Sequence, residues 1–152
     1  MSASMRDPGF LSLFANRALM AALAAMASSQ LVKVLAPLAR GRAPDLRRLG
    51  DYGGFPSAHS AFISACAFEI GLVDGFGSGI FALAAVSAAI IISDILRLRS
   101  TVERSKADIE VLFERTGLAR PGASPQFRSH SPLEVLAGIL WGCLCALGIY
   151  IV

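Results

Sequence analysis

Residues 79–96 read GIFALAAVSAAIIISDIL, an apolar run with one charged residue, Asp94. Crossing the hydrocarbon core of a bilayer takes about 20 helical residues, so this run is close to a full membrane span. Residues 18–38 and 132–152 form two further apolar runs of that length. A fourth, about residues 57–75, opens on polar side chains and spans only if these are buried among the other helices. The sequence therefore predicts four transmembrane helices.

The composition of the whole chain is typical of a membrane protein. Of its 152 residues, 55% are hydrophobic and 16% are charged. A soluble domain of this size has too little interior to bury so much apolar surface. We therefore expect a single all-α membrane domain over residues 1–152, a polytopic helix bundle.

A fifth, amphipathic helix is predicted between the third and fourth spans. The stretch Ser100-Thr101-Val102-Glu103 has the spacing of a capping box, which marks a helix start. Apolar residues recur behind it at roughly helical intervals, as in a helix that lies on a membrane surface. Gly117 is expected to end this helix.

Basic residues lie mainly on one side of the predicted membrane. Eleven of the fourteen Lys and Arg fall in the loops 39–56 and 97–131, whereas the link 74–78 has none. This asymmetry orients both loops toward the cytoplasm and both termini outward, as in a bacterial-type inner membrane protein. Nucleic acid is not an expected partner, because neither a basic helix nor interleaved aromatics are present.

The start of the first predicted span is similar to a signal peptide. Arg17 precedes the apolar run, and Ala25-Met26-Ala27 has the pattern of a cleavage site. The run continues to Leu35, which favours a retained helix over a cleaved signal.

The three cysteines, Cys66, Cys143 and Cys145, all lie in predicted spans. An odd number without a CxxC pair predicts apolar filling rather than disulfides or metal ligation.

Polar side chains gather at the cytoplasmic ends of all four predicted spans. They are Lys33 in the first, Ser57, His59 and Ser60 in the second, Asp94, Arg97 and Arg99 at the end of the third, and His130 and Glu134 at the start of the fourth. Ionisable groups at membrane depth usually face a bundle interior or a cavity. Cations beside helix N-termini favour an anion. Because histidine can attack phosphorus or transfer a proton near neutral pH, the cluster predicts a phosphate site.

The motifs of this cluster resemble those of a known family. The run GGFPSAHS, from Gly53 to Ser60, is similar to the Pro-Ser-x-His motif of the type 2 phosphatidic acid phosphatase and vanadium haloperoxidase superfamily. It is more similar to the small divergent membrane branch of that superfamily. The other motifs of the branch have counterparts in the same order: Gln30 and Lys33, Asp94 with Leu98-Arg99, and His130, Pro132, Glu134 and Val135. The resemblance covers roughly residues 15–152.

The chain departs from the branch pattern at several positions, which affect the phosphate-binding cations more than the histidines. Phe55 replaces a Met, Ala58 a Ser, Ser100 an Arg, Ser129 a Gly, and Arg97 a Gly. In the wider superfamily an Arg lies six residues before the nucleophilic His, where this chain has Ser124.

The resemblance implies a mechanism and a set of site residues. His130 would attack phosphorus to form a phosphohistidine, Glu134 would orient its imidazole, and His59 would protonate the leaving oxygen. The implied substrate-binding residues are Lys33, Gly54, Ser57, Ser60, Asp94, Arg97 and Arg99. This chemistry needs no metal and no other cofactor.

Several of these residues also have a structural interpretation. Glu134 lies three residues after Ser131 and can complete a capping box. Lys33 can extend to the headgroups, and Asp94 can pair with a neighbouring arginine, while the arginines themselves can anchor the helix end. The serines at the start of the second span can serve as caps alone. Glu69, deeper in that span, is expected to be a neutral acid hydrogen-bonded between helices and outside the site.

The sequence therefore predicts a phosphatase for a lipid phosphate presented at the cytoplasmic leaflet. Phosphatidylglycerophosphate, phosphatidate and polyprenyl phosphate are all compatible with it. The alternative is a non-catalytic membrane module that binds anionic lipid or a protein partner. Haloperoxidase activity is not expected, because it suits a larger, soluble scaffold. Four spans are fewer than the six helices implied for the superfamily's core, so a homodimer that completes the bundle is a further expectation.

Overall fold

The computed structural model describes residues 9–46, 54–117 and 131–152, and within them every regular element is a helix. In chain order these elements are η1 (Phe10–Ala15), α1 (Arg17–Leu35), η2 (Ala36–Arg40), α2 (Ala58–Asp74), α3 (Gly79–Thr116) and α4 (Pro132–Ile151). The all-α prediction is confirmed.

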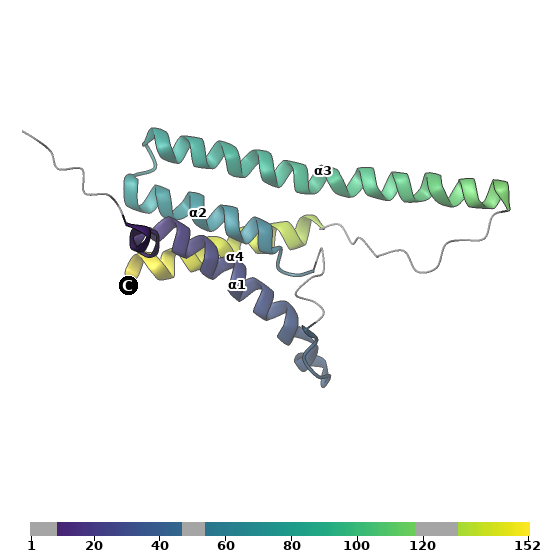
Figure 1. Ribbon diagram of the computed structural model, residues 1–152, viewed down its shortest axis with the longest axis horizontal. Helices are drawn as coiled ribbons and strands as arrows, with labels where there is room; N and C mark the ends of the chain where they lie inside the picture. Colours follow the sequence, from purple (N-terminus) through teal and green to yellow (C-terminus); the bar gives the residue numbers. More distant parts are fainter. Residues whose placement is uncertain (1–8, 47–53, 118–130) are drawn as a thin grey trace, which may run out of the picture.

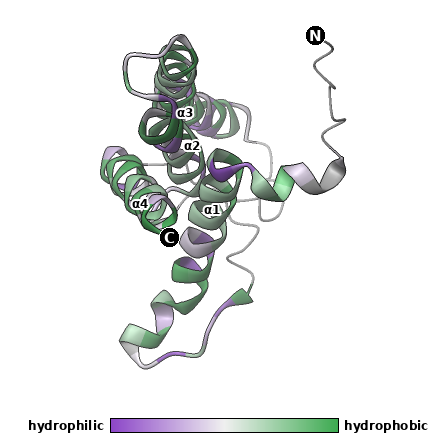
Figure 2. Cartoon of the chain, turned by 90° about the vertical axis from the view of Figure 1, so that its left-hand side faces the viewer, coloured by the Kyte–Doolittle hydropathy of each residue, from purple (hydrophilic) through white to green (hydrophobic). Residues whose placement is uncertain are grey.

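The shortest of the four α-helices, α2, lies at the centre of the bundle. It packs against α4, α1 and α3, whereas α3 packs mainly against α2 (Figure 1). Figure 2 views the bundle from the end where α1 begins and α4 ends, and shows hydrophobic residues along much of all four α-helices. Large apolar side chains such as Leu83, Ile90 and Leu140 are exposed there. Lipid tails cover such a surface without the cost that water would impose.

Within the described residues, three helices are long and apolar enough to cross a membrane: Arg17–Ala39, Gly79–Thr116 and Pro132–Ile151. They contain the predicted spans 18–38 and 79–96 and nearly all of 132–152. The fourth predicted span corresponds to α2, which has 17 residues and is therefore at the short end of the range for a membrane-spanning helix. Its crossing of the membrane stays a prediction.

The predicted break between the third span and an amphipathic surface helix is wrong. α3 is one continuous helix of 38 residues, so the Ser100–Glu103 stretch lies inside it and does not start a second helix. No Gly or Pro occurs from Ile80 to Thr116, and the polar residues after Leu96 are compatible with a helix. At 1.5 Å per residue α3 is about 57 Å long, against a hydrocarbon core of about 30 Å. Its second half therefore projects beyond the bundle (Figure 1).

Most helix ends follow local sequence signals. Asn16, Ser57, Ser78 and Ser131 are the N-cap residues of the four α-helices, and each side chain accepts a backbone N–H from the first turn. Gly117 ends α3 as predicted, with the positive φ of 65° that glycine adopts without strain.

Small residues bring α1, α2 and α4 close together. Gly138 and Gly142 of α4 lie against the carbonyls of Ser57 and Ala61 on α2, where a Cβ would overlap backbone atoms. This is the glycine spacing at which membrane helices approach closely. The fully buried core of the contact is made of alanines: Ala21, Ala25, Ala61, Ala65 and Ala146. The close approach of α4 fixes its first turn against the first turn of α2.

Candidate functional site

The first turns of α2 and α4 meet at one end of the bundle. The backbone N–H of Ser57 donates to the carbonyl of Glu134, at 2.9 Å. Gly138, one turn further along α4, allows this approach because it adds no side chain against the Ser57 carbonyl. Both Ser57 and Glu134 are buried. Two of the four predicted contributions to the site are therefore brought together.

The serines at the start of α2 cap it, as their structural interpretation predicts. The hydroxyl of Ser57 accepts the N–H of Ser60 at 3.4 Å, and the hydroxyl of Ser60 donates to the Ser57 hydroxyl oxygen at 3.0 Å. Both side chains are fully buried. Such capping fixes the first turn of α2, whose remaining amides and positive dipole end favour an anion.

Lys33 of α1 lies beside the loop that leads into α2. It is 5% exposed, and its Cδ and Cε atoms lie 3.6 Å from the position that a Cβ on Gly54 would occupy. Gly54 has a φ of +97°, a conformation that favours glycine, so the backbone itself packs on the lysine stem. The lysine is covered by protein rather than extended along a lipid-facing surface. Its cation therefore belongs to the bundle end where α2 begins.

Glu134 completes the capping box of α4. Its carboxylate accepts the N–H of Ser131 at 2.9 Å, and its own N–H donates to the Ser131 hydroxyl at 3.2 Å. The structural interpretation of Glu134 is thus confirmed. A carboxylate offers about four lone-pair positions, so capping alone uses one of them and does not preclude a second role.

Three further predicted site residues have exposed side chains. His59 lies in the first turn of α2 between the two buried serines, and its own side chain is exposed. Asp94 and Arg97 are exposed on α3. Counting back from the turn that joins α2 to α3, Asp94 lies level with Ala58, so α3 delivers its polar residues at the height of the site.

Two of the predicted site residues cannot be placed in the same way. His130 lies outside the described residues, and only the backbone of Arg99, within α3, belongs to them. The residue that follows His130, Ser131, is the cap of α4.

Gln30 is a polar residue of the site region that was not included in the predicted set. It precedes Lys33 by three residues and therefore shares its helix face. Its Oε1 atom is buried and has no hydrogen-bond partner among the described residues. The spacing Gln30-x-x-Lys33 could have predicted it, because two polar residues on one helix face near the end of an apolar span are expected to share a site.

Comparison with known proteins identifies the family. The Divergent PAP2 family matches residues 14–145, which include every residue of the predicted site. The chain belongs to the Divergent PAP2 family. It is also similar to the uncharacterized membrane protein YuiD of Bacillus subtilis (strain 168), with 28% identity over 151 residues, 90% of this chain and 96% of that protein. No solved structure matches the chain.

Membership of the Divergent PAP2 family confirms the resemblance inferred from the motifs. The similarity to a membrane protein agrees with the three long apolar helices. The chain is therefore a helical membrane protein whose polar residues from α1, α2 and α4 meet at one end of the bundle.

Proposed function

We propose that this protein is a membrane-embedded phosphatase that hydrolyses a lipid phosphate monoester or diphosphate. The proposal rests on two contacts at one end of the bundle: Ser57, the cap of α2, meets buried Glu134, and buried Lys33 packs on Gly54 three residues before that cap. A buried cation next to a helix N-terminus favours an anion with several oxygens. Membership of a phosphatase-related family gives the anion its chemical class.

The reaction proceeds in two steps that share one histidine. His130 attacks phosphorus while the bond from phosphorus to the lipid oxygen breaks, and His59 gives that oxygen its proton. Water then attacks the phosphohistidine and passes a proton to His59 while the nitrogen–phosphorus bond breaks. Inorganic phosphate leaves, and both histidines return to their starting states.

The buried groups stabilise charge during both steps. Lys33 and the amides of the first turn of α2 face the negative charge that develops on the phosphoryl oxygens. Glu134 stabilises the positive imidazole of His130 in addition to capping α4. Arg97, Arg99 and Asp94 of α3 complete the binding of the headgroup.

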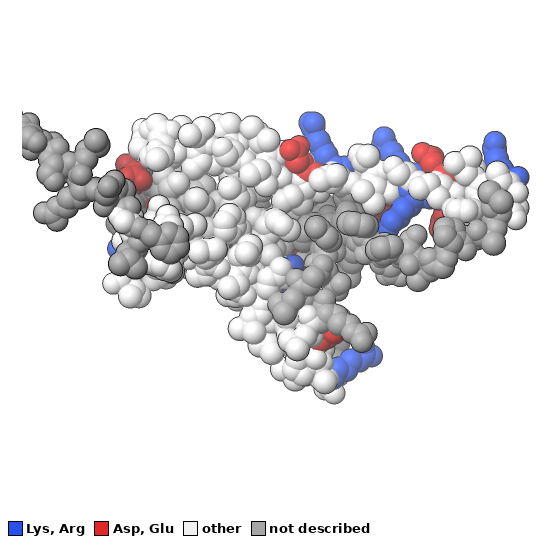
Figure 3. All heavy atoms as spheres, in the orientation of Figure 1, with Lys and Arg blue, Asp and Glu red and all other residues white. Residues whose placement is uncertain are grey.

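The site faces the cytoplasmic leaflet of a bacterial-type inner membrane in this proposal. Figure 3 shows Lys and Arg along the projecting half of α3 and at the tip that follows α1. Basic residues concentrate on the cytoplasmic side of membrane proteins. Phosphatidylglycerophosphate, phosphatidate and polyprenyl phosphate all present a terminal phosphate that such a site accepts.

The test uses the purified full chain in vesicles that contain each of these lipid phosphates in turn. Released inorganic phosphate is measured with and without vanadate, which mimics the transferring phosphoryl group. We expect release from at least one lipid and its inhibition by vanadate. Lipid binding without release from any member of the panel would contradict the proposal.

That last outcome would support the second candidate, a non-catalytic module that binds anionic lipid or a protein partner. The exposure of Asp94 and Arg97 favours it, because ionisable groups of a functional site in a membrane usually face the bundle interior or a cavity. Ser100 stands where the branch pattern has an arginine, and Ser124 where the wider superfamily has one, so two cations that would bind phosphate are missing.

A homodimer also remains a proposal. α3 packs mainly against α2 and leaves Ile80, Leu83 and Ile90 exposed on its outer face. Crosslinking in native lipid tests this proposal, and a monomer at all protein-to-lipid ratios would rule it out.

A further inference from the structure

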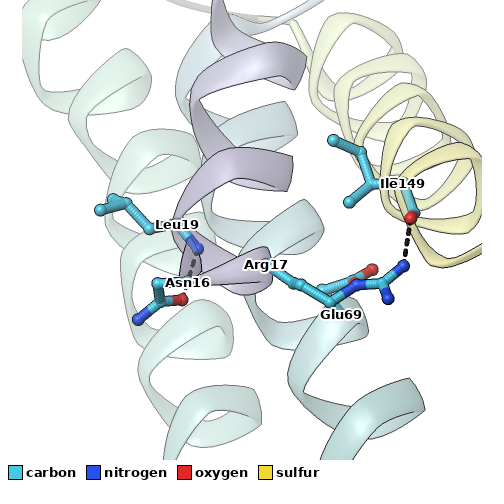
Figure 4. Close-up of polar contacts among 5 residues, drawn as sticks. All are labelled: Asn16, Arg17, Leu19, Glu69 and Ile149. Carbon is cyan, nitrogen blue, oxygen red and sulfur yellow. Dashed lines mark hydrogen bonds and ion pairs between the residues drawn. The ribbon is translucent and has the colours of Figure 1, made fainter. Parts of the chain in front are cut away.

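An ion pair lies at the end of the bundle away from the candidate site. The Nε atom of Arg17, the first residue of α1, is 3.3 Å from Oε1 of Glu69 on α2 (Figure 4). The guanidinium also donates to the carbonyl of Ile149 near the end of α4, and its Cζ lies 5.7 Å from the ring centroid of Tyr150. One side chain therefore connects three helices.

Glu69 depends on this arginine for its charge balance. It is 0% exposed, and neither carboxylate oxygen accepts a hydrogen bond within the described part of the chain. The expectation of a neutral, hydrogen-bonded acid is therefore replaced by an ion pair with Arg17. A buried carboxylate without a nearby cation is strongly unfavourable, above all in a bundle surrounded by lipid.

Between its two ends, the contact of α1 with α2 is lined by small side chains. Every fourth residue of α1 lies along one helix face, and a row with the same spacing runs along α2. The alanines of both rows belong to one buried cluster, which α4 also joins through Ala146. The two rows are Arg17, Ala21, Ala25, Ser29 and Lys33 on α1, and Ser57, Ala61, Ala65 and Glu69 on α2. From Ala21 to Lys33 and throughout the α2 row, these residues are buried.

Alanine and serine permit close approach but distinguish poorly between axial positions of the two helices, because their side chains form shallow ridges. A slip of α1 by one helical turn, about 5.4 Å, would keep small residues against small residues. It would also separate Arg17 from Glu69 and move Lys33 away from Gly54. Against such a slip, α1 has its charged ends and a contact in its middle, the hydrogen bond that Trp141 Nε1 of α4 donates to the Ser28 hydroxyl at 2.9 Å. Because Ser28→Cys replaces that hydroxyl, the disulfide assay described below reports mainly on the charged ends.

We propose that Arg17 and Glu69 are positioning residues, a register lock that holds Lys33 in the candidate phosphate site. Arg17 and Lys33 are 16 residues apart on one helix, about 24 Å along its axis. The effect on substrate binding rests on the proposed function, whereas the register of α1 does not.

A disulfide measures the register without any enzyme assay. The Ser28 hydroxyl oxygen of α1 is 3.7 Å from Sγ of Cys145 on α4. In a Cys66→Ala, Cys143→Ala background, Ser28→Cys should therefore form a disulfide with Cys145 under mild oxidation. Protection from thiol alkylation gives the yield, and helical circular dichroism in detergent reports whether each variant is folded.

Three variants distinguish an effect on the register of α1 from an effect on the stability of the fold. Arg17→Lys keeps the cation and should keep the yield. Arg17→Ala leaves Glu69 uncompensated and can fail to fold. Arg17→Met with Glu69→Leu removes both charges, and such apolar replacement of a buried ion pair is usually tolerated by the fold. If the lock exists, this double variant is folded but its disulfide yield falls several-fold. A folded double variant with the parental yield overturns the proposal.

Whether the Arg17–Glu69 pair affects the candidate site is measured by the KM for the lipid phosphate, in the chain with its three natural cysteines. The double variant should raise KM about tenfold, as expected for losing one charge-assisted contact, with kcat changed much less. Arg42→Ala, at the other end of the bundle, should leave both unchanged. A lower disulfide yield with unchanged KM contradicts the role assigned to Lys33. If no lipid phosphate is hydrolysed, the proposed function fails while the disulfide result still decides the register.

Discussion

The two ends of the α1–α2 contact both bury charge, but they balance it in different ways. At one end Arg17 faces Glu69 at 3.3 Å, so opposite charges compensate each other within the chain. At the other end, the proposed anion-binding end, buried Lys33 packs on Gly54 in the loop that leads into α2, three residues before the Ser57 cap. The first end is an ion pair with its countercharge in the chain, whereas the second is the end to which we assign the phosphate. In this proposal, one pair of helices has a stabilising end and a ligand-binding end.

The largest effect is expected at the histidines of the anion-binding end. His130→Ala removes the nucleophile and should lower kcat by about 10⁴-fold or more, and His59→Ala removes the general acid and should cost about 10²- to 10⁴-fold. Phosphate release from the preferred lipid measures both. His59→Ala should leave thermal stability nearly unchanged, because the His59 side chain is exposed. Full turnover by both variants would refute the mechanism.

The next largest effect is expected at the ion-pair end and concerns stability. Arg17→Ala should lower the free energy of unfolding by about 3 kcal/mol, the lower part of the range for breaking a buried pair, because Arg17 itself is half-exposed. The double change Arg17→Met with Glu69→Leu should recover most of that loss. Denaturant titration in detergent gives both values. Equal losses for the single and double variants would show that the pair does not stabilise the fold.

Lys33→Met tests the anion-binding end without disturbing its packing. Methionine keeps an unbranched stem against Gly54 but removes the cation, so kcat/KM should fall about 10- to 100-fold through one lost charge-assisted contact. The other lysine of the chain, Lys106, is exposed on the projecting half of α3. Lys106→Met is the matched control and should be silent. Equal effects of the two changes would indicate a general loss of charge attraction rather than a specific site.

The smallest expected effects separate the two roles of Glu134. Ser131→Ala should cost about 1 kcal/mol of stability, as the loss of an N-cap usually does. Glu134→Gln keeps a side chain that can cap α4 but removes the charge that stabilises the imidazole, so stability should persist while kcat falls. Parallel measurements of unfolding and phosphate release give the answer. A drop in stability without a drop in kcat would leave Glu134 with the capping role alone.

Much of the fold could be predicted because the signals are local. The apolar runs predict the positions of α1, α3 and α4. The spacing of Ser131 and Glu134 predicts the start of α4, where the structure has a capping box formed by these two residues. The prediction of a helix break near Ser100 was wrong because a capping-box spacing can also occur inside a helix. After Gly79, α3 contains no glycine or proline that would interrupt it before Gly117. Polarity alone does not end a helix that leaves the membrane.

The site was predictable only as far as helix topology determines it. Alternating spans predict Lys33, Ser57 and Glu134 at one end of the bundle, and at that end the structure places Ser57 against Glu134 and Lys33 against Gly54. The side-chain partners could not be predicted, because they depend on tertiary packing. Gly138 was missed although its spacing from Gly142 indicates a close helix contact. The partner of Glu69 was missed because Arg17 is 52 residues away in the sequence and was interpreted only as a flanking charge.

The most direct test of the phosphatase is to trap its covalent intermediate. The purified chain is mixed with a lipid phosphate labelled on phosphorus, quenched within one turnover in alkali, and digested for mass spectrometry. We expect label on the peptide that contains His130, stable in alkali, lost in acid, and absent from His130→Ala. Phosphate release without any labelled protein, or label that persists in His130→Ala, would contradict the assignment of His130 as the nucleophile.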